Sequence, residues 1–239
     1  YGTAFVTNTS PVRLGSSGSN NRMTVRDGAR YYGWISIGAA MGATNNLLTI
    51  TGAGTRYACV TYDNRNENDA YLSSGGAGSF NRALIDDGAR VELLFNTTSG
   101  SRRGLVTGVY SNSCGNEIVI RGKSFVTNTG WMCIGNAHTT WGGGSGNRVV
   151  IDDAAYFGQT VYVGGGASGL GSLGASTNNA LTVCGGAQVS VGTLQFGNAT
   201  NSCSNRLALD GPATYLYAGE LYGYSADNAI SITNATFEP

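Results

Sequence analysis

The sequence is poor in charge, in histidine and in proline. Only 12% of its 239 residues are charged, the formal net charge is zero, and no acidic or basic block occurs. Nucleic acid and an anionic membrane surface are therefore not expected partners. No apolar stretch approaches the ~20 residues that a transmembrane helix needs, which argues against membrane insertion. His138 is the only histidine, so a metal centre built from several histidines is excluded.

Cysteine is sparse as well. None of the five cysteines forms a C-x-x-C pair, so no zinc or redox motif is expected, and we expect neither a metal nor another cofactor. Cys114 and Cys133 share a spacing of 19 residues with Cys184 and Cys203, which allows intramolecular disulfides of the kind found in an oxidising, extracellular setting. Alternatively, Cys59, Cys133 and Cys184 are small core residues with free thiols.

What the sequence does contain is 38 glycines and a repeat. A segment led by asparagine, typified by N-A-L-T-V-C-G-G from Asn179, occurs eight times at spacings of 25, 35, 35, 31, 32, 26 and 23 residues. The eight asparagines are Asn21, Asn46, Asn81, Asn116, Asn147, Asn179, Asn205 and Asn228. Self-similarity at such a period predicts a repeat architecture.

Each repeat contains the pattern of three short strands. The second and fourth residues after every leading asparagine are apolar, as in Leu181 and Val183, and this alternation predicts a half-buried strand. A turn and two further apolar runs follow, the last of them ending in glycine, as in V-Y-V-G from Val161. We therefore expect an all-β chain with one domain over 1–239. It is predicted to be a parallel β-helix of about eight to nine coils, with three short strands per coil.

Two observations support stacked coils. Equivalent positions in consecutive coils lie about 4.8 Å apart, so like charges should be avoided there. Two rows alternate in sign, namely Arg82, Glu117, Arg148 and Asp86, Arg121, Asp152. The leading asparagines are expected to form a ladder of hydrogen-bonded amides along the axis. Alternatively, or in addition, asparagine occurs there because it tolerates the left-handed backbone of a turn.

Both ends of the repeat are expected to be incomplete coils, over 1–20 and 228–239, without a capping segment. Natural solenoids normally cap their ends, so we expect another copy to cover each end, head to tail, in a contact that grows into a filament. The residues predicted for this interface are Phe5, Val6, Val12, Leu14, Ile230, Ile232 and Phe237. Removing Tyr1–Ser10 is expected to abolish this growth. The alternative is a processed or excised fragment of a longer chain whose caps are missing.

Insertions in two neighbouring coils carry the polar candidates for a binding site. Stacking is expected to bring Asp63, Glu67 and Asp69 near Arg102 and Arg103. These residues would form a polar binding site or a calcium site. Alternatively, they belong to two solvated loops joined by weak ion pairs. An exposed aromatic residue binds sugar rings. Trp141 is therefore a candidate contact for surface glycans.

Catalysis finds little support in the sequence. The adjacent pairs Asp86-Asp87 and Asp152-Asp153 resemble the paired carboxylates of glycoside hydrolysis, yet they fall at the turn of the repeat, where turn chemistry also explains them. His138 lies next to a glycine run and is more typical of a loop. We expect no catalytic residues and no enzyme activity, with a polysaccharide lyase or hydrolase as the second alternative.

Repeats of the form N-x-L-T-V-x-G-G-A, followed by a V-x-V-G or L-x-F-G run, resemble the β-strand repeats of autotransporter passengers and related secreted bacterial proteins. This resemblance implies a right-handed parallel β-helix outside the cell or on its surface, often in adhesion or surface layers. The predicted function is that of an extracellular structural protein that assembles with itself, head to tail, into a filament or surface fibre. The first alternative is an adhesin or carbohydrate-binding module.

Overall fold

The computed structural model describes residues 4–8, 10–61, 72–95, 103–110, 112–135, 143–165, 176–197 and 202–239. Within these ranges the chain is all β, and it contains no helix that could cross a membrane. Every named strand pair is parallel, and the strands form two curled sheets of eight and thirteen strands. The predicted all-β, parallel, solenoid-like fold is therefore confirmed.

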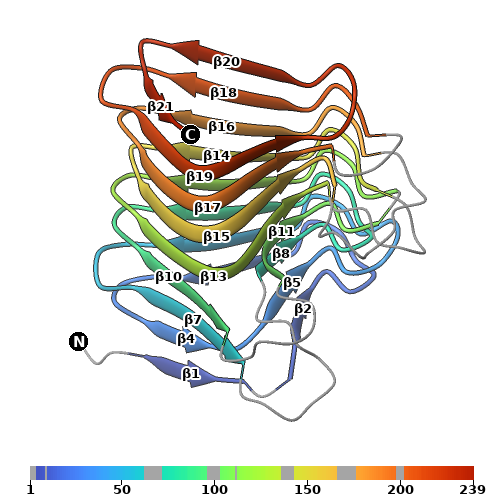
Figure 1. The fold of residues 1–239 in the computed structure, drawn as a ribbon. Coiled ribbons are helices and arrows are strands. Elements are labelled where there is room, and N and C mark those ends of the chain that lie inside the picture. The colour runs from blue at the N-terminus through green and yellow to red at the C-terminus, as the bar shows by residue number, and fades with distance from the viewer. Residues whose placement is uncertain are drawn as a thin grey trace.

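The eight-stranded sheet is built from the asparagine-led segments, stacked in chain order from β3 to β20 (Figure 1). Its strands are β3 (Arg22–Val25), β6 (Leu47–Thr51), β9 (Arg82–Asp86), β12 (Glu117–Arg121), β14 (Arg148–Asp152), β16 (Ala180–Cys184), β18 (Arg206–Asp210) and β20 (Ala229–Thr233). Each strand begins one residue after a repeat asparagine. The alternation in the sequence therefore sets the register of this sheet.

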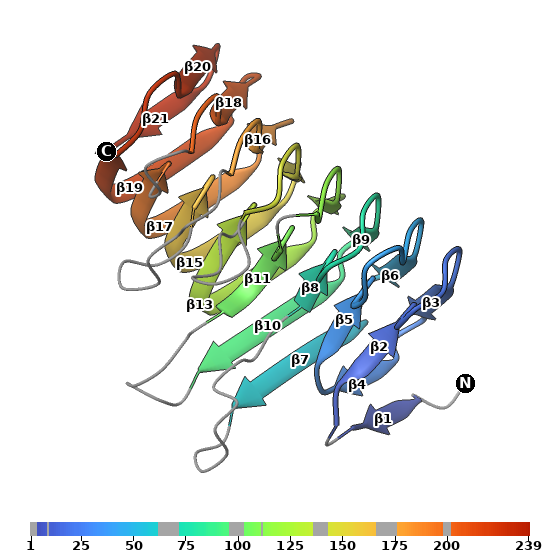
Figure 2. The same ribbon diagram turned by 90° about the vertical axis from the view of Figure 1, so that its right-hand side faces the viewer.

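The thirteen-stranded sheet contains two parallel rows of strands that merge (Figure 2). The first row, here called the β1–β21 row, consists of β1 (Phe5–Thr7), β4 (Arg30–Tyr32), β7 (Arg56–Thr61), β10 (Arg90–Phe95), β13 (Phe125–Ile134), β15 (Ala155–Val163), β17 (Gln188–Phe196), β19 (Tyr215–Gly223) and β21 (Thr236–Glu238). The second, the β2–β19 row, consists of β2 (Val12–Leu14), β5 (Ile35–Ile37), β8 (Leu72–Ser74), β11 (Arg103–Thr107) and the C-terminal halves of β13, β15, β17 and β19.

The merging of these rows modifies the expected three strands per coil. The coils that begin with β3, β6 and β9 each have three separate strands. From β13 onward the second and third strands are one continuous strand, and the pairing of β13 with β15 has a register irregularity between Asn128 and Trp131 at the bend. A bulge of this kind lets a strand turn a corner without breaking its pairing.

The core fills the space between the sheets. The second and fourth residues after the asparagines point inward, and Leu48, Ile50 and Ile118 are fully buried. At the last strand the same positions, Ile230 and Ile232, are 43% and 48% exposed. These two side chains are exposed because β20 is an edge strand of its sheet.

Candidate functional site

The repeat asparagines form one continuous row of hydrogen bonds along the stack, here called the asparagine row. At every step the backbone N–H and the side-chain Nδ2 of one asparagine both donate to Oδ1 of the next, at 2.9–3.2 Å. The six inner members, from Asn46 to Asn205, are buried. Hydrogen bonds in a buried, dry environment are costly to lose. The row therefore ties each coil to the next.

The left-handed backbone lies one residue before the asparagine row. Asn45, Phe80 and Ser204, each directly preceding a row member, have φ values of 56°, 56° and 57°. Asparagines of the row itself are not among the residues with positive φ. Tolerance of a left-handed backbone therefore explains the residue before each row member. The asparagine itself is explained by its hydrogen bonds to the neighbouring coils.

The asparagine row has a direction, because each donor pair points toward the C-terminal end of the stack. Asn21 begins the row as a donor to Asn46, and Asn228 ends it as the acceptor from Asn205. Among the described residues no donor reaches Oδ1 of Asn21 and no acceptor reaches the backbone N–H of Asn228. One end of the row therefore presents an acceptor and the other end a donor.

A row of glycines packs directly on the asparagines. Six glycines that directly follow the third strands of their coils have positive φ, namely Gly15, Gly38, Gly75, Gly108, Gly135 and Gly164. A Cβ atom on any of these six would lie 2.1–2.3 Å from an atom of an asparagine side chain. Glycine is required there by the turn and by this close approach. The sequence showed the glycine but not its contact.

Serines three residues before four of the asparagines support the row from the side. The Nδ2 groups of Asn116, Asn179 and Asn205 donate to the hydroxyls of Ser113, Ser176 and Ser202 at 3.0, 3.0 and 3.1 Å. Ser225 accepts in the same way from Asn228. Our sequence interpretation missed these residues, although the spacing S-x-x-N recurs in the sequence and would have identified them.

The two charge rows form ion pairs between coils. Glu117 bridges Arg82 and Arg148, at 2.8 and 2.5 Å. In the other row Arg121 contacts Asp86 at 2.8 Å, and this hydrogen bond lowers the pKa of the Asp86 carboxyl. These pairs are partly exposed, so each adds little to stability, but like charges in their place would oppose the stacking.

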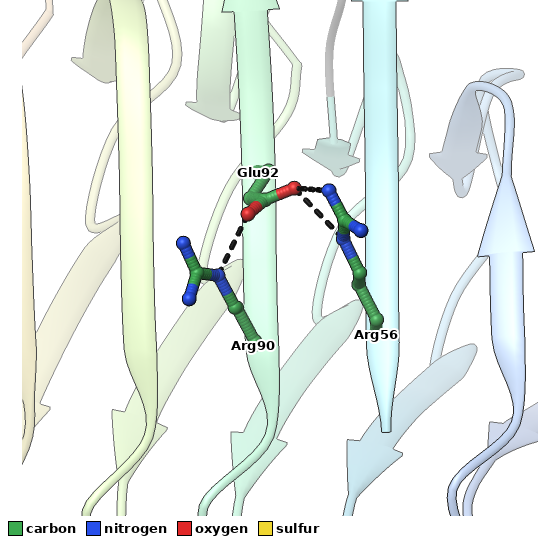
Figure 3. Close-up of polar contacts among 3 residues, drawn as sticks. All are labelled: Arg56, Arg90 and Glu92. Atoms are coloured by element: carbon green, nitrogen blue, oxygen red, sulfur yellow. Dashed lines mark hydrogen bonds and ion pairs between the residues drawn. The ribbon is translucent and has the colours of Figure 1, made fainter. Parts of the chain in front are cut away.

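A third charged cluster contradicts the rule that like charges avoid each other in a stack. Arg30, Arg56 and Arg90 are in register on neighbouring strands. Glu92, 8% exposed, lies between two of them and contacts Arg90 at 2.7 Å and Nε of Arg56 at 2.8 Å (Figure 3). Its hydrogen bond raises the pKa of Arg56. The compensating carboxylate is that of Glu92, two residues after Arg90 on the same strand. A comparison of equivalent positions in consecutive coils therefore does not reveal it.

Both terminal edges present apolar side chains. Val6, Val12 and Leu14 are in register with Tyr31, Ile35 and Ile37, which are buried. At the other edge Ile230, Ile232 and Phe237 are in register with Leu207, Leu209 and Leu216, which are buried as well. All six therefore lie at core positions of the two ends.

Phe5 differs from the other predicted interface residues in the face of the strand that it occupies, and Leu221 was missed. Phe5 is in register with the exposed Arg30, and its ring lies 5.1 Å from that of Tyr32, so it belongs to the outer face instead of the terminal core. Leu221 of β19 is in register with the buried Leu194 of β17, and its own side chain is 38% exposed. It therefore belongs to the C-terminal edge, and only the pairing of β19 identifies it.

The disulfides that the cysteine spacing allows are not formed: Cys114, Cys184 and Cys203 have free thiols. Cys184 ends β16 and is in register with Asp210 at the end of β18, whereas Cys203 precedes the start of β18. Cys133 lies inside β13, whereas Cys114 lies in the turn before β12. Members of each pair thus occupy different places in the coil, and equal spacing along the chain does not imply the close approach that a disulfide needs.

Most of the predicted loop candidates lie outside the described residues, namely Asp63, Glu67, Asp69, Arg102, Trp141 and His138. Arg103 begins β11, but its side chain is also outside that description. Asp87 and Asp153 have left-handed φ values of 55° and 49°, as expected of turn residues. In the described part of the chain, no group of three or more acidic, histidine or cysteine residues is arranged to hold a metal ion.

No protein-family model matches the chain, and no curated protein or solved structure matches it. The resemblance to autotransporter repeats therefore stays a prediction from the sequence pattern. The features of the structure that bear on function are the asparagine row and the two terminal edges.

Proposed function

We propose that the chain is a right-handed parallel β-helix and an extracellular structural protein, which assembles with itself head to tail into a filament or surface fibre. The direction of the asparagine row carries this proposal. An unpaired acceptor at Asn21 and an unpaired donor at Asn228 are complementary only when the N-terminal edge of one copy meets the C-terminal edge of another. Two like ends would bring donor against donor or acceptor against acceptor.

The side chains at the two edges support the same orientation. Ile230 and Ile232 are about half exposed, and the Met23 and Val25 positions of a second copy would continue their two inward rows. Burying apolar surface of this kind stabilises association by about 25 cal/mol per Å². At the outer positions of this strand pair, Arg22 and Arg26 of the second copy would meet Ala229 and Thr233, so neither position brings like charges together.

The number of strands in each row sets how two copies fit. In the described part of the chain, the eight-stranded sheet and the β2–β19 row each contain eight strands, whereas the β1–β21 row contains nine. If β3 of one copy lies on β20 of another, and β2 lies on β19, then β1 falls at the height that β21 already occupies. We therefore propose that one of these two short strands leaves its place in the joint. At 4.8 Å per strand, the filament would repeat every ~38 Å.

Replacing Ile232 with aspartate is expected to prevent filament growth and to leave the fold of the single copy intact. Its side chain is already 48% exposed, so a charge there costs the isolated chain little, but in the joint the carboxylate would be buried without a partner. Electron microscopy and sedimentation velocity over a range of concentrations measure the effect. Ser231→Asp, on the opposite face of the same strand, is the matched control and should still assemble. Growth of the Ile232→Asp variant at the wild-type rate would contradict the proposal, as would a wild-type chain that stays monomeric.

Removal of Tyr1–Ser10 is expected to accelerate filament growth, which reverses the expectation from the sequence. The deletion removes β1 and frees the position that β21 occupies. Removal of Thr236–Pro239, which contains β21, should accelerate growth in the same way. The double deletion leaves that position empty and should grow more slowly than either single deletion. Light scattering after dilution from denaturant gives the rates, and slower growth of both single deletions would overturn the overlap of the two strands.

A further inference from the structure

A pocket of about 290 Å³ lies on the outer face of the β2–β19 row. Its lining includes the outward residues of four successive strands, Arg13, Ser36, Ser73 and Val106. The turns that follow these strands contribute Ser16, Gly76 and Tyr110 among others. The pocket therefore runs along the stack across four coils. Its volume is at the small end of the range for small-molecule sites.

The part of the pocket near the N-terminal end is polar and cationic. Ser73 is 1% exposed, and its hydroxyl has no hydrogen-bond partner among the described residues. Ser36, in register with it, is 7% exposed. Arg13 continues the row and is the only charged residue among the described residues that line the pocket. A buried hydroxyl without a partner is costly, and a ligand hydroxyl in the pocket would satisfy it.

The other end of the pocket is apolar. Val106 and Val109 are 1% and 7% exposed and pack with Cys133 and Tyr162, and Tyr110 lies against this cluster. Flat apolar surface beside hydroxyl groups is the combination that binds the face and the edge of a sugar ring. A guanidinium group adds a preference for a carboxylate, which it binds through charge-assisted hydrogen bonds.

We propose that this pocket binds an acidic sugar, with the carboxylate at Arg13, ring hydroxyls at Ser36 and Ser73, and the ring face against Val106 and Tyr110. Arg13 lies on β2, the edge strand of the proposed joint, whereas Ser36, Ser73 and Val106 lie on β5, β8 and β11. The pocket is present in the single copy, so binding of the sugar does not require filament formation. Neutral sugars would fill the same space but would lack the contact with Arg13.

Titration of the 239-residue chain with D-glucuronate and with D-glucose, followed by NMR chemical shifts, tests the proposal. Glucuronate is expected to bind about tenfold more tightly than glucose, because one charge-assisted hydrogen bond is lost with the neutral sugar. Arg13→Gln should remove this preference and leave glucose binding unchanged. Ser73→Ala should weaken both sugars several-fold. Arg22→Gln, at an exposed arginine on the eight-stranded sheet, is the matched control and should change neither affinity.

Three results would overturn the proposal: no saturable binding of either sugar, equal affinities for both, or a glucuronate preference that survives Arg13→Gln. An oligomer of the same uronic acid distinguishes two sources of the ligand. Tighter binding of the oligomer than of the monomer would identify a glycan chain as the ligand, and equal binding would identify a single sugar unit.

Discussion

Replacing Asn147 with alanine is expected to lower the free energy of unfolding by about 3–4 kcal/mol. The side chain is fully buried, and its Oδ1 accepts the N–H and Nδ2 groups of Asn116, both at 3.0 Å. Its Nδ2 donates to the carbonyl of Ser113 at 3.0 Å and to Oδ1 of Asn179 at 3.2 Å. The variant leaves these groups buried without their partner, because the neighbouring coils hold them in place. Urea unfolding followed by circular dichroism measures the loss.

Asn21→Ala is the matched control for Asn147→Ala. Asn21 is exposed and lies at the end of the row, so water replaces the lost contacts and the expected cost is about 1 kcal/mol or less. Equal effects of the two variants would show that burial within the row contributes nothing. Asn147→Asp adds a test by pH, since burial would raise the pKa of the new carboxyl above its unfolded value of about 3.9. Its destabilisation should therefore be complete above the raised pKa and fade as the pH falls toward 4.

Replacing Gly135 with alanine is expected to destabilise the fold by about 3 kcal/mol or more. The residue has φ +67°, and a Cβ atom there would lie 2.3 Å from Nδ2 of Asn179. The left-handed backbone alone costs an alanine about 1 kcal/mol, and the remainder comes from displacing Asn179 from its hydrogen bonds. Thermal and urea unfolding give the total.

Gly146→Ala separates these two contributions. Gly146 has nearly the same φ, +66°, but nothing lies within 4 Å of the position of its Cβ. The control should cost only the conformational term of about 1 kcal/mol. If both variants lose the same stability, close packing of the glycines against the asparagine row is not what requires glycine at Gly135.

The main architecture could be predicted because it is repeated. Every coil imposes the same demands on a strand, so the apolar alternation after residues such as Asn147 and Asn179 appears many times and outweighs chance. Charge pairs such as Arg82 and Glu117 could be predicted for the same reason, since they occupy one position in consecutive coils.

Features that occur once, or that depend on geometry across positions, could not be predicted in this way. Glu92 contacts Arg56 from a different position on the strand, so no comparison of equivalent positions reveals it. The spacing of Cys184 and Cys203 along the chain does not determine where each lies around the coil, so it could not predict whether they approach each other. Phe5 was predicted for the terminal interface with six other apolar residues, and only its register with Arg30 shows that it lies on the outer face of that edge. The pocket at Ser73 arises from outward residues of four coils whose identities differ.

The equivalence of the steps in the asparagine row has a consequence for how such a gene can change. Asn147 bonds to Asn179 as Asn116 bonds to Asn147, so the duplication of one whole turn creates new junctions identical to the old ones. A duplication that ends inside a strand can shift the inward and outward faces of that strand, whereas insertions between strands, which make the asparagine spacings vary from 23 to 35 residues, add no height. The height of the stack therefore changes only in whole turns, each adding or removing ~4.8 Å.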